Sequence, residues 1–304
     1  MTGELLQDEF IVSSLPDNGG FSDGNSAALA WDIIHKAGTH STPDVINLSK
    51  CVHLKPYAIA CLCAMSLKAQ VNEKQIRIVP PENVDCASHL ARLGVPGFFT
   101  GEWNNSDSCK TNITVKHVEW PPESEGERIV DVLAPRTDLP PGVFPRMVEG
   151  LDEIVLNALT HSGSPISCVV AGQAFPSTSK VEVAVLDFGC TIRHHLTKNP
   201  KYATVSSDHH AITLALEDGV TGTPDGSRNV RGEQNSGAGL AYLKEYCETG
   251  GGELTVLSGD CWITVGADIE PITGKLHLPF NGCLVNIRYF TKNDLLSVPI
   301  EPIL

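Results

Sequence analysis

The chain has 304 residues, 41% of them hydrophobic, and a formal net charge of −14 at pH 7. The length favours two domains of ~100–200 residues each, while the negative charge argues against nonspecific binding to nucleic acid or to anionic membranes, which requires a basic surface. No run approaches the ~20 apolar residues of a membrane span, and the acidic start MTGELLQDEF lacks the basic region of a signal peptide.

The first part of the chain alternates strand and helix patterns. In chain order we predict a helix at 25–38, a strand at 45–54, a helix at 56–72, a strand at 74–81 and a helix at 83–95. Pro56 suits the first turn of its helix, and Gly94 suits the end of the last one. This order predicts a small α/β layer domain over residues 1–103.

Residues 104–142 differ in character, because proline and charge dominate PPESEGER and APRTDLPPG. We interpret this stretch as a connector. Within it, NITVKHVEW at 112–120 alternates well enough to predict one strand, which would suit the edge of a sheet.

The second part, 143–304, predicts an α+β sandwich with helices on one face of a mixed or antiparallel sheet. In chain order we predict a helix at 143–162, strands at 166–175 and 180–189, helices at 210–219 and 236–252, and strands at 252–260, 261–269 and 282–290.

Three short segments of this part carry the chemistry. In EIVLNALTH, Glu153, Asn157 and His161 share one helix face, because four residues are just over one turn. DFGCTI at 187–192 places an acid at a strand end, and NSGAGL at 235–240 places glycines at a loop-to-helix junction. Together these segments look like the parts of a nucleotide pocket.

The segments resemble the motifs of the GHKL superfamily, the ATP-binding domain with a Bergerat-type fold that DNA gyrase, the heat-shock chaperone ATPase, histidine kinases and MutL share. Its N box, E-x-x-x-N-A followed by a basic or aromatic residue, matches Glu153, Asn157 and His161. Its two glycine boxes, D-x-G-x-G and G-x-G-L, fall on Asp187, Gly189, Thr191, Gly237, Gly239 and Leu240. The family has a second glycine in the first box where this chain has Thr191. The resemblance covers about the C-terminal half of the chain.

The resemblance implies a base-binding end of the pocket. Asp187 would accept a hydrogen bond from the adenine amino group, and Gly189 would let the backbone approach the base. Thr191 cannot adopt φ > 0 cheaply, so the loop after Cys190 must follow another path.

The resemblance also implies a phosphate-binding end. Asn157 would bind Mg²⁺ through its amide oxygen, and Gly237 and Gly239 would present backbone N–H groups to the phosphates. Glu153 would orient or deprotonate a water for hydrolysis, or would only support Mg²⁺ and water indirectly. His161 would donate to a phosphate, or would act only as a cation at a helix C-terminus.

Residues 193–235 correspond to the ATP lid of the family. Arg228 and Arg231 are its best candidates for cations that close over the phosphates. Four histidines also fall in this segment, His194, His195, His209 and His210. We interpret them as part of a solvated loop and not as a metal site, because no cysteine or carboxylate spacing matches them.

The first half resembles another family more weakly. VINLSKCVHLKPYAIACL is similar to STAS-type domains, which partner anti-sigma kinases of this same ATPase class. The phosphorylatable serine of that family would fall near Pro56 and Tyr57, so the acceptor is missing and the domain would bind or sense without being phosphorylated. An unrelated small α/β domain stays open.

The cysteine pattern bears on location. The ten cysteines contain no C-x-x-C pair and lie mostly in apolar runs. Cysteines in such runs behave as small buried hydrophobes. We therefore expect a reduced, cytoplasmic chain without a cysteine-bound metal.

Three functions follow as hypotheses. The first is a regulatory switch that binds ATP and Mg²⁺, is reset by slow hydrolysis through Glu153, and uses its N-terminal domain to bind a protein partner. The second is a histidine-kinase-like or anti-sigma-type protein kinase acting on a separate protein. The third is a non-catalytic binding module with a degenerate pocket. A homodimer stays open, and a gyrase-like motor is disfavoured because the sequence ends at Leu304 without the domain that supplies the catalytic lysine.

Overall fold

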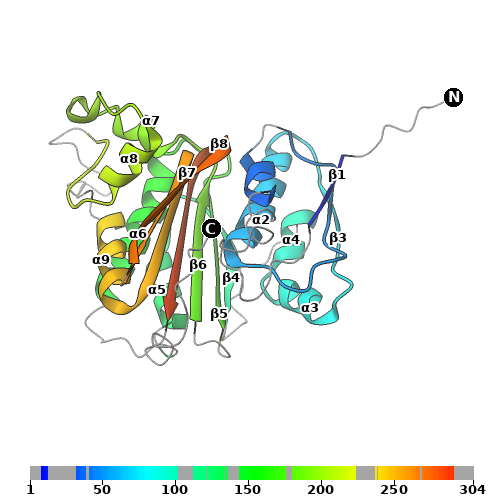
Figure 1. Cartoon of the computed structure of the whole chain (residues 1–304). Coiled ribbons are helices and arrows are strands. Elements are labelled where there is room, and N and C mark those ends of the chain that lie inside the picture. Colours follow the sequence, from blue (N-terminus) through cyan, green and yellow to red (C-terminus); the bar gives the residue numbers. More distant parts are fainter. Residues whose placement is uncertain are drawn as a thin grey trace.

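The structure, a computed structural model, describes residues 8–12, 32–38, 41–101, 112–120, 122–133, 135, 144–175, 180–223, 237, 239–267 and 269–290. The described part is a mixed α/β protein with one parallel and one antiparallel sheet (Figure 1). Helix α2 (Pro56–Val71) lies between the two sheets.

The three-stranded parallel sheet belongs to the N-terminal part of the chain. Its strands lie in the order β1 (Glu9–Ile11), β2 (Val45–Asn47) and β3 (Arg77–Val79). Both β2 and β3 are shorter than the sequence predicts. The chain leaves β2 after Asn47, because the side-chain oxygen of Asn47 accepts from the Ser49 backbone N–H at 2.9 Å and closes a turn.

All but α4 of the described helices of this part form at the predicted places. The described helices are a helical stretch at 32–38, then α2, α3 (Val84–Arg92) and α4 (Val95–Thr100). The start of the predicted helix 25–38 lies outside the described residues. The helix predicted at 83–95 is confirmed as α3, which ends just before Gly94 at φ +79°, whereas α4 beyond this glycine is not among the predicted elements.

The five-stranded sheet has the order β4-β5-β6-β8-β7, and all its neighbouring strands are antiparallel. Its strands are β4 (Asn112–Val118), β5 (Cys168–Phe175), β6 (Lys180–Asp187), β7 (Gly252–Gly266) and β8 (Ile269–Phe290). The strand predicted at 112–120 is confirmed at the sheet edge. Residues 104–142, interpreted as a connector with one edge strand, contribute that strand to the sheet as β4.

Strand β7 reverses direction within its length. The side-chain hydroxyls of Thr255 and Thr264 lie 2.8 Å apart, although nine residues of one extended strand span roughly 30 Å. The chain therefore folds back between them, where Gly259 adopts φ +65°. The two halves of β7 correspond to the strands predicted at 252–260 and 261–269. The first half of β8, which pairs with the second half of β7, has no counterpart among the predicted elements.

Three described helices cover the face of this sheet that points away from α2 (Figure 1): α5 (Glu125–Leu133), α6 (Phe144–Thr160) and α9 (Gly239–Gly250). Helix α5 lies in the stretch interpreted as a connector. Its start is bound to α6, because the Asp152 carboxylate accepts from the Ser124 hydroxyl and the Gly126 N–H, both at 2.8 Å. Two short helices, α7 (Ile192–Leu196) and α8 (Asp208–Ala215), lie at one end of the sheet.

The hydrophobic core has a part on each face of the antiparallel sheet. One part joins the sheet to α2 and the other N-terminal elements, and the second joins the sheet to α5, α6 and α9. In the first part, the Phe280 ring of β8 lies 5.7 Å from the Phe188 ring and packs against Gly38. The N-terminal part and the sheet thus share one core. Although α2 is strongly apolar, neither it nor any other described helix has the length and apolar character to cross a membrane.

The shared core predicts a strong effect of Phe280→Ala. The ring is 1% exposed, so its removal should lower the free energy of unfolding by about 3–5 kcal/mol. Leu278, on the same strand and 55% exposed, is the matched control, and Leu278→Ala should change the free energy by less than ~0.5 kcal/mol. Urea denaturation followed by circular dichroism measures both. Equal losses in the two variants would contradict the shared core.

Candidate functional site

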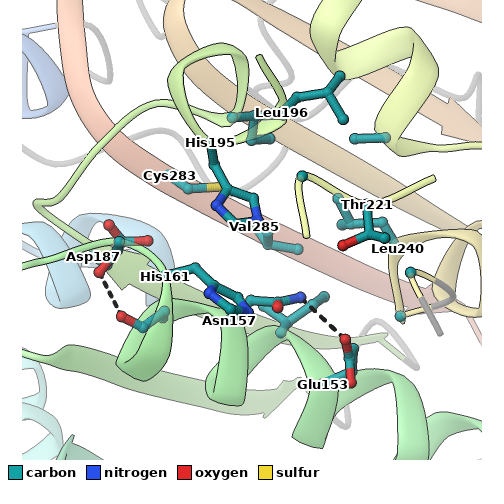
Figure 2. A pocket seen from close by; sticks show the side chains of 18 of the residues that line it. Glu153, Asn157, His161, Asp187, His195, Leu196, Thr221, Leu240, Cys283 and Val285 are labelled. Atoms are coloured by element: carbon teal, nitrogen blue, oxygen red, sulfur yellow. Dashed lines mark hydrogen bonds between the residues drawn. The ribbon is translucent and has the colours of Figure 1, made fainter. Parts of the chain in front are cut away.

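A pocket opens at one end of the antiparallel sheet, between α6, α7 and the start of α9 (Figure 2). Its cavity volume is about 130 Å³, whereas a single buried water needs only ~10–15 Å³. Apolar side chains form much of its wall, among them Ile154, Val185 and Val285. The size and the walls suit an organic ligand.

Helix α6 presents a polar face to this pocket. Glu153, Asn157 and His161 all line it, as their four-residue spacing predicts (Figure 2). The opposite face of α6 packs into the core through Leu151 and Val155. The Asn157 amide nitrogen donates to the Glu153 carboxylate at 3.5 Å, so the amide oxygen is the Asn157 atom suited to a cation.

Asp187, the last residue of β6, lies at the other end of the pocket from Glu153 (Figure 2). It is only 4% exposed, and its Oδ1 accepts from the Gly189 N–H at 2.8 Å. Burial raises the pKa of Asp187 to about 7, although hydrogen bonds from two backbone N–H groups and from Ser162 act to lower it. A carboxyl group with this pKa in an apolar pocket is typical of a functional site.

Gly189 does not line the pocket, and its role is in the packing of the loop after β6. A Cβ at this position would overlap the carbonyl group of Ser162, just after the end of α6. The Cys190 backbone N–H donates to the same carbonyl at 2.6 Å. The glycine thus lets the loop after β6 close against α6, which differs from its expected role of letting the backbone approach a base.

Thr191 stands at the missing glycine of the first box and begins a helix. It is the N-cap of α7 with φ −70°, and its side chain accepts from the His194 N–H at 3.2 Å. This φ lies outside the positive range that favours glycine, so the loop accommodates threonine at this position. The next residue, Ile192, donates its N–H to the Ser258 hydroxyl at 3.0 Å, which holds α7 to β7.

The glycines before and at the start of α9 both have very close neighbours. Gly237 lines the pocket with φ +62°, and a Cβ there would lie 2.7 Å from the Val220 carbonyl oxygen. A Cβ on Gly239 would lie 2.7 Å from the Cβ of Glu153. Only glycine therefore allows α9 to begin against the polar face of α6. Leu240 follows and also lines the pocket.

The segment predicted to be the lid is folded in its first half. Residues 192–223 include α7, α8 and a short 3₁₀ helix, η4 (Pro200–Tyr202), around a small apolar cluster. The Arg193 Nε lies 3.0 Å from the buried Asp208 carboxylate, and the Asp260 N–H donates to the same carboxylate at 3.0 Å. The first contact joins α7 to α8, and the second holds α8 to the turn in β7.

Arg228 and Arg231 lie outside the described residues, so their role at the phosphates stays a prediction. Three of the four histidines of this segment are exposed, but they lie on α7 and α8 and not in a loop, so that part of the interpretation is wrong: His194, His209 and His210. Within the described ranges, no group of three His, Cys, Asp or Glu side chains is placed to hold a metal ion.

His195 is a pocket residue that no sequence motif indicates. Its ring points from α7 into the pocket and stacks on His161, with ring centroids 4.6 Å apart (Figure 2). Its Nδ1 is buried and has no hydrogen-bond partner among the described residues. Burial, and then the charges of His161 and Lys198, lower the pKa of His195 to about 4. No local pattern indicates this role, because α7 is only five residues long.

Comparison with known proteins leaves the family open. No protein-family model, no curated protein and no solved structure matches this chain. The GHKL and STAS resemblances therefore rest on the sequence motifs alone.

The raised pKa of Asp187 predicts a pH-dependent stability. The folded protein holds the proton of the Asp187 carboxyl group more tightly than the unfolded chain, in which the pKa of this group has its usual value of 3.8. The bound proton therefore stabilises the fold at low pH, and this stabilisation is lost as the pH rises through about 7. Asp187→Asn cannot ionise, so it should gain stability relative to the wild type by up to roughly 1.4 kcal/mol per pH unit between about pH 5 and 7. Urea denaturation of both proteins at several pH values measures the difference, and parallel curves would contradict it.

Proposed function

We propose that this chain is a GHKL-type protein that binds ATP with Mg²⁺ and acts as a conformational switch. The observation that carries the proposal is a pocket with two chemically different ends. A buried carboxyl group, Asp187, lies at one end. Glu153 and Asn157 lie at the other end. They lie beside the start of α9, where a side chain larger than that of Gly239 would overlap Glu153. A nucleotide has the same two ends, a flat base with an amino group and a charged phosphate chain.

Asp187 suits the adenine ring. Its ionised carboxylate would accept a hydrogen bond from the exocyclic amino group, and the apolar walls from α6 and β8 would cover the ring. Guanine carries a carbonyl oxygen where adenine carries this amino group. Because an ionised carboxylate repels a carbonyl oxygen, the site should favour adenine over guanine.

Asn157 and the start of α9 suit the phosphates. The Asn157 amide oxygen would bind Mg²⁺, a cation that also takes phosphate oxygens and would neutralise their charge. The start of α9 would present N–H groups and the positive end of the helix dipole. Glu153, which accepts from Asn157, would orient a water for slow hydrolysis.

We propose the N-terminal part as a STAS-like domain that binds a protein partner. Its parallel sheet with flanking helices agrees with a small α/β layer. Pro56 and Tyr57, where the family's acceptor serine would fall, are buried in the first turn of α2. A kinase could not reach this position, so phosphorylation there is not part of the proposal.

The pocket and the N-terminal part are linked by adjacent residues. Asp187 lies in the pocket, while the next residue, Phe188, belongs to the core shared with α2. The Lys68 ammonium of α2 lies 5.0 Å from the centre of the Phe188 ring. A movement of this loop on nucleotide binding would therefore reach α2, which is how we propose that the switch acts.

Binding of ATP and GTP to four proteins tests the proposal. The wild type should bind ATP more tightly with Mg²⁺ than without it, and Asn157→Ala should lose this dependence on Mg²⁺. Asp187→Asn should weaken ATP binding by roughly tenfold or more, about 1.4 kcal/mol, and should reduce the preference for ATP over GTP. Glu217→Gln, an exposed change just beyond α8, is the control and should bind as the wild type does.

The outcomes separate the competing functions. No ATP binding by the wild type would overturn the proposal and leave a module with a degenerate pocket. Phosphate release that is lost in Glu153→Ala supports a switch with slow hydrolysis. Binding without release, but with transfer of labelled phosphate to an added partner protein, would instead identify a protein kinase.

A further inference from the structure

Thr221 lies on the pocket wall that faces the polar side of α6 (Figure 2). It belongs to the segment predicted to be the lid and to none of the three motifs. A Cβ on Gly237 would lie only 3.1 Å from the Cβ of Thr221, so Thr221 lies beside the chain that leads into α9. Asp187 lies far from it, at the other end of the pocket (Figure 2). Thr221 is therefore at the end that we assign to the phosphates.

A buried amide holds the backbone of Thr221 in place. The side-chain nitrogen of Asn199 donates to the Thr221 carbonyl at 3.1 Å and to the Thr223 carbonyl at 3.1 Å. The side-chain oxygen of Asn199 accepts from the Lys201 N–H at 3.0 Å, and the residue is only 6% exposed. Asn199 thus joins the pocket wall to the end of α7 and to η4, which are the folded part of the same segment.

The Thr221 hydroxyl has a hydrogen to donate to the pocket. Its oxygen accepts from the Thr223 backbone N–H at 3.1 Å, and no acceptor among the described residues takes its own hydrogen. A hydroxyl can donate one hydrogen bond while it accepts others. Because Thr221 is half-buried and lines the cavity, a ligand can reach this hydroxyl.

The charge of the pocket makes a neutral donor valuable. The lining residues within the described ranges include two acids, Asp187 and Glu153, but no lysine and no arginine. An anionic ligand group therefore depends on hydrogen bonds from uncharged donors as well as on a cation. Hydrogen bonds to a charged acceptor are roughly twice as strong as those between neutral groups. A phosphate is thus the part of a nucleotide that would gain most from the Thr221 hydroxyl.

We propose that the Thr221 hydroxyl donates a hydrogen bond to the phosphate chain of the bound nucleotide, beside the start of α9. This inference rests on the proposed function, because it presupposes a nucleotide with its base at Asp187. It adds a ligand-binding residue that the motifs do not contain. Through Asn199, the same contact would connect the phosphate chain to α7 and η4.

Isothermal titration calorimetry with adenosine and ADP tests the contact. Adenosine carries the base but no phosphate, and Mg²⁺ is left out so that the metal does not contribute. Thr221→Val keeps the shape of the side chain and removes the hydroxyl, so ADP should bind roughly tenfold more weakly, as expected for one hydrogen bond to a charged acceptor. Adenosine should bind to this variant as it does to the wild type.

Two further variants make the test specific. Thr221→Ser keeps the hydroxyl, so it should bind ADP nearly as the wild type does. Thr213→Val is the matched control, because Thr213 is exposed on α8, does not line the pocket, and donates its hydroxyl to the His209 carbonyl at 2.9 Å. This control should bind both ligands as the wild type does. Adenosine binding shows in each case that the variant is folded and that its base site is intact.

The outcomes separate the contact from the proposed function. An unchanged affinity of Thr221→Val for ADP would overturn the contact while ATP binding stands. An equal loss of adenosine and ADP binding would also overturn it, because the hydroxyl would then serve the nucleoside. Loss of ADP binding in Thr221→Ser as large as in Thr221→Val would overturn it as well, since the hydroxyl would not be the cause. Failure of the wild type to bind either ligand would overturn the proposed function, and the contact with it.

Discussion

The burial of Asp187 at the end of β6 is the constraint on which the site depends. On one side, Gly189 brings its loop so close to the Ser162 carbonyl that no side chain fits between them. On the other side, a Cβ on Gly282 would overlap the backbone carbonyl of Asp187. The carboxyl group of Asp187 is buried in this tightly packed region, and its burial raises the pKa to about 7. A ligand with a hydrogen-bond donor at this end of the pocket would compensate for that burial.

The same loop connects the two faces of the antiparallel sheet. Asp187 serves the pocket, and Phe188 enters the core between the sheet and α2, where it meets Phe280. A movement of this loop at the pocket would therefore also disturb the core. If the loop moved with the nucleotide, the Phe188 ring would have to repack beneath Lys68. This arrangement explains why the N-terminal part, with α2 buried on nearly all sides, is joined to the sheet by a common core.

The sequence indicates most helices and the polar face of α6, because periodicity and capping are local properties. Glu153, Asn157 and Asp187 could be placed in one pocket through the order of the motifs. His195 could not be placed, because its position depends on how the chain after Thr191 packs against α6. The role of Gly189 is also set by a distant neighbour, the Ser162 carbonyl. The sequence alone could not show how β4 and α5 join the C-terminal part, because their positions depend on contacts with distant elements. Strand β4 pairs with β5, and the start of α5 is bound to α6.

A crystal structure of the protein with ADP and Mg²⁺ tests the central claim most directly. We predict that the adenine amino nitrogen lies about 3 Å from the Asp187 carboxylate. The phosphates should lie at the start of α9, with Mg²⁺ at the Asn157 amide oxygen. An adenine ring bound elsewhere, with Asp187 making no contact to the ligand, would contradict the account.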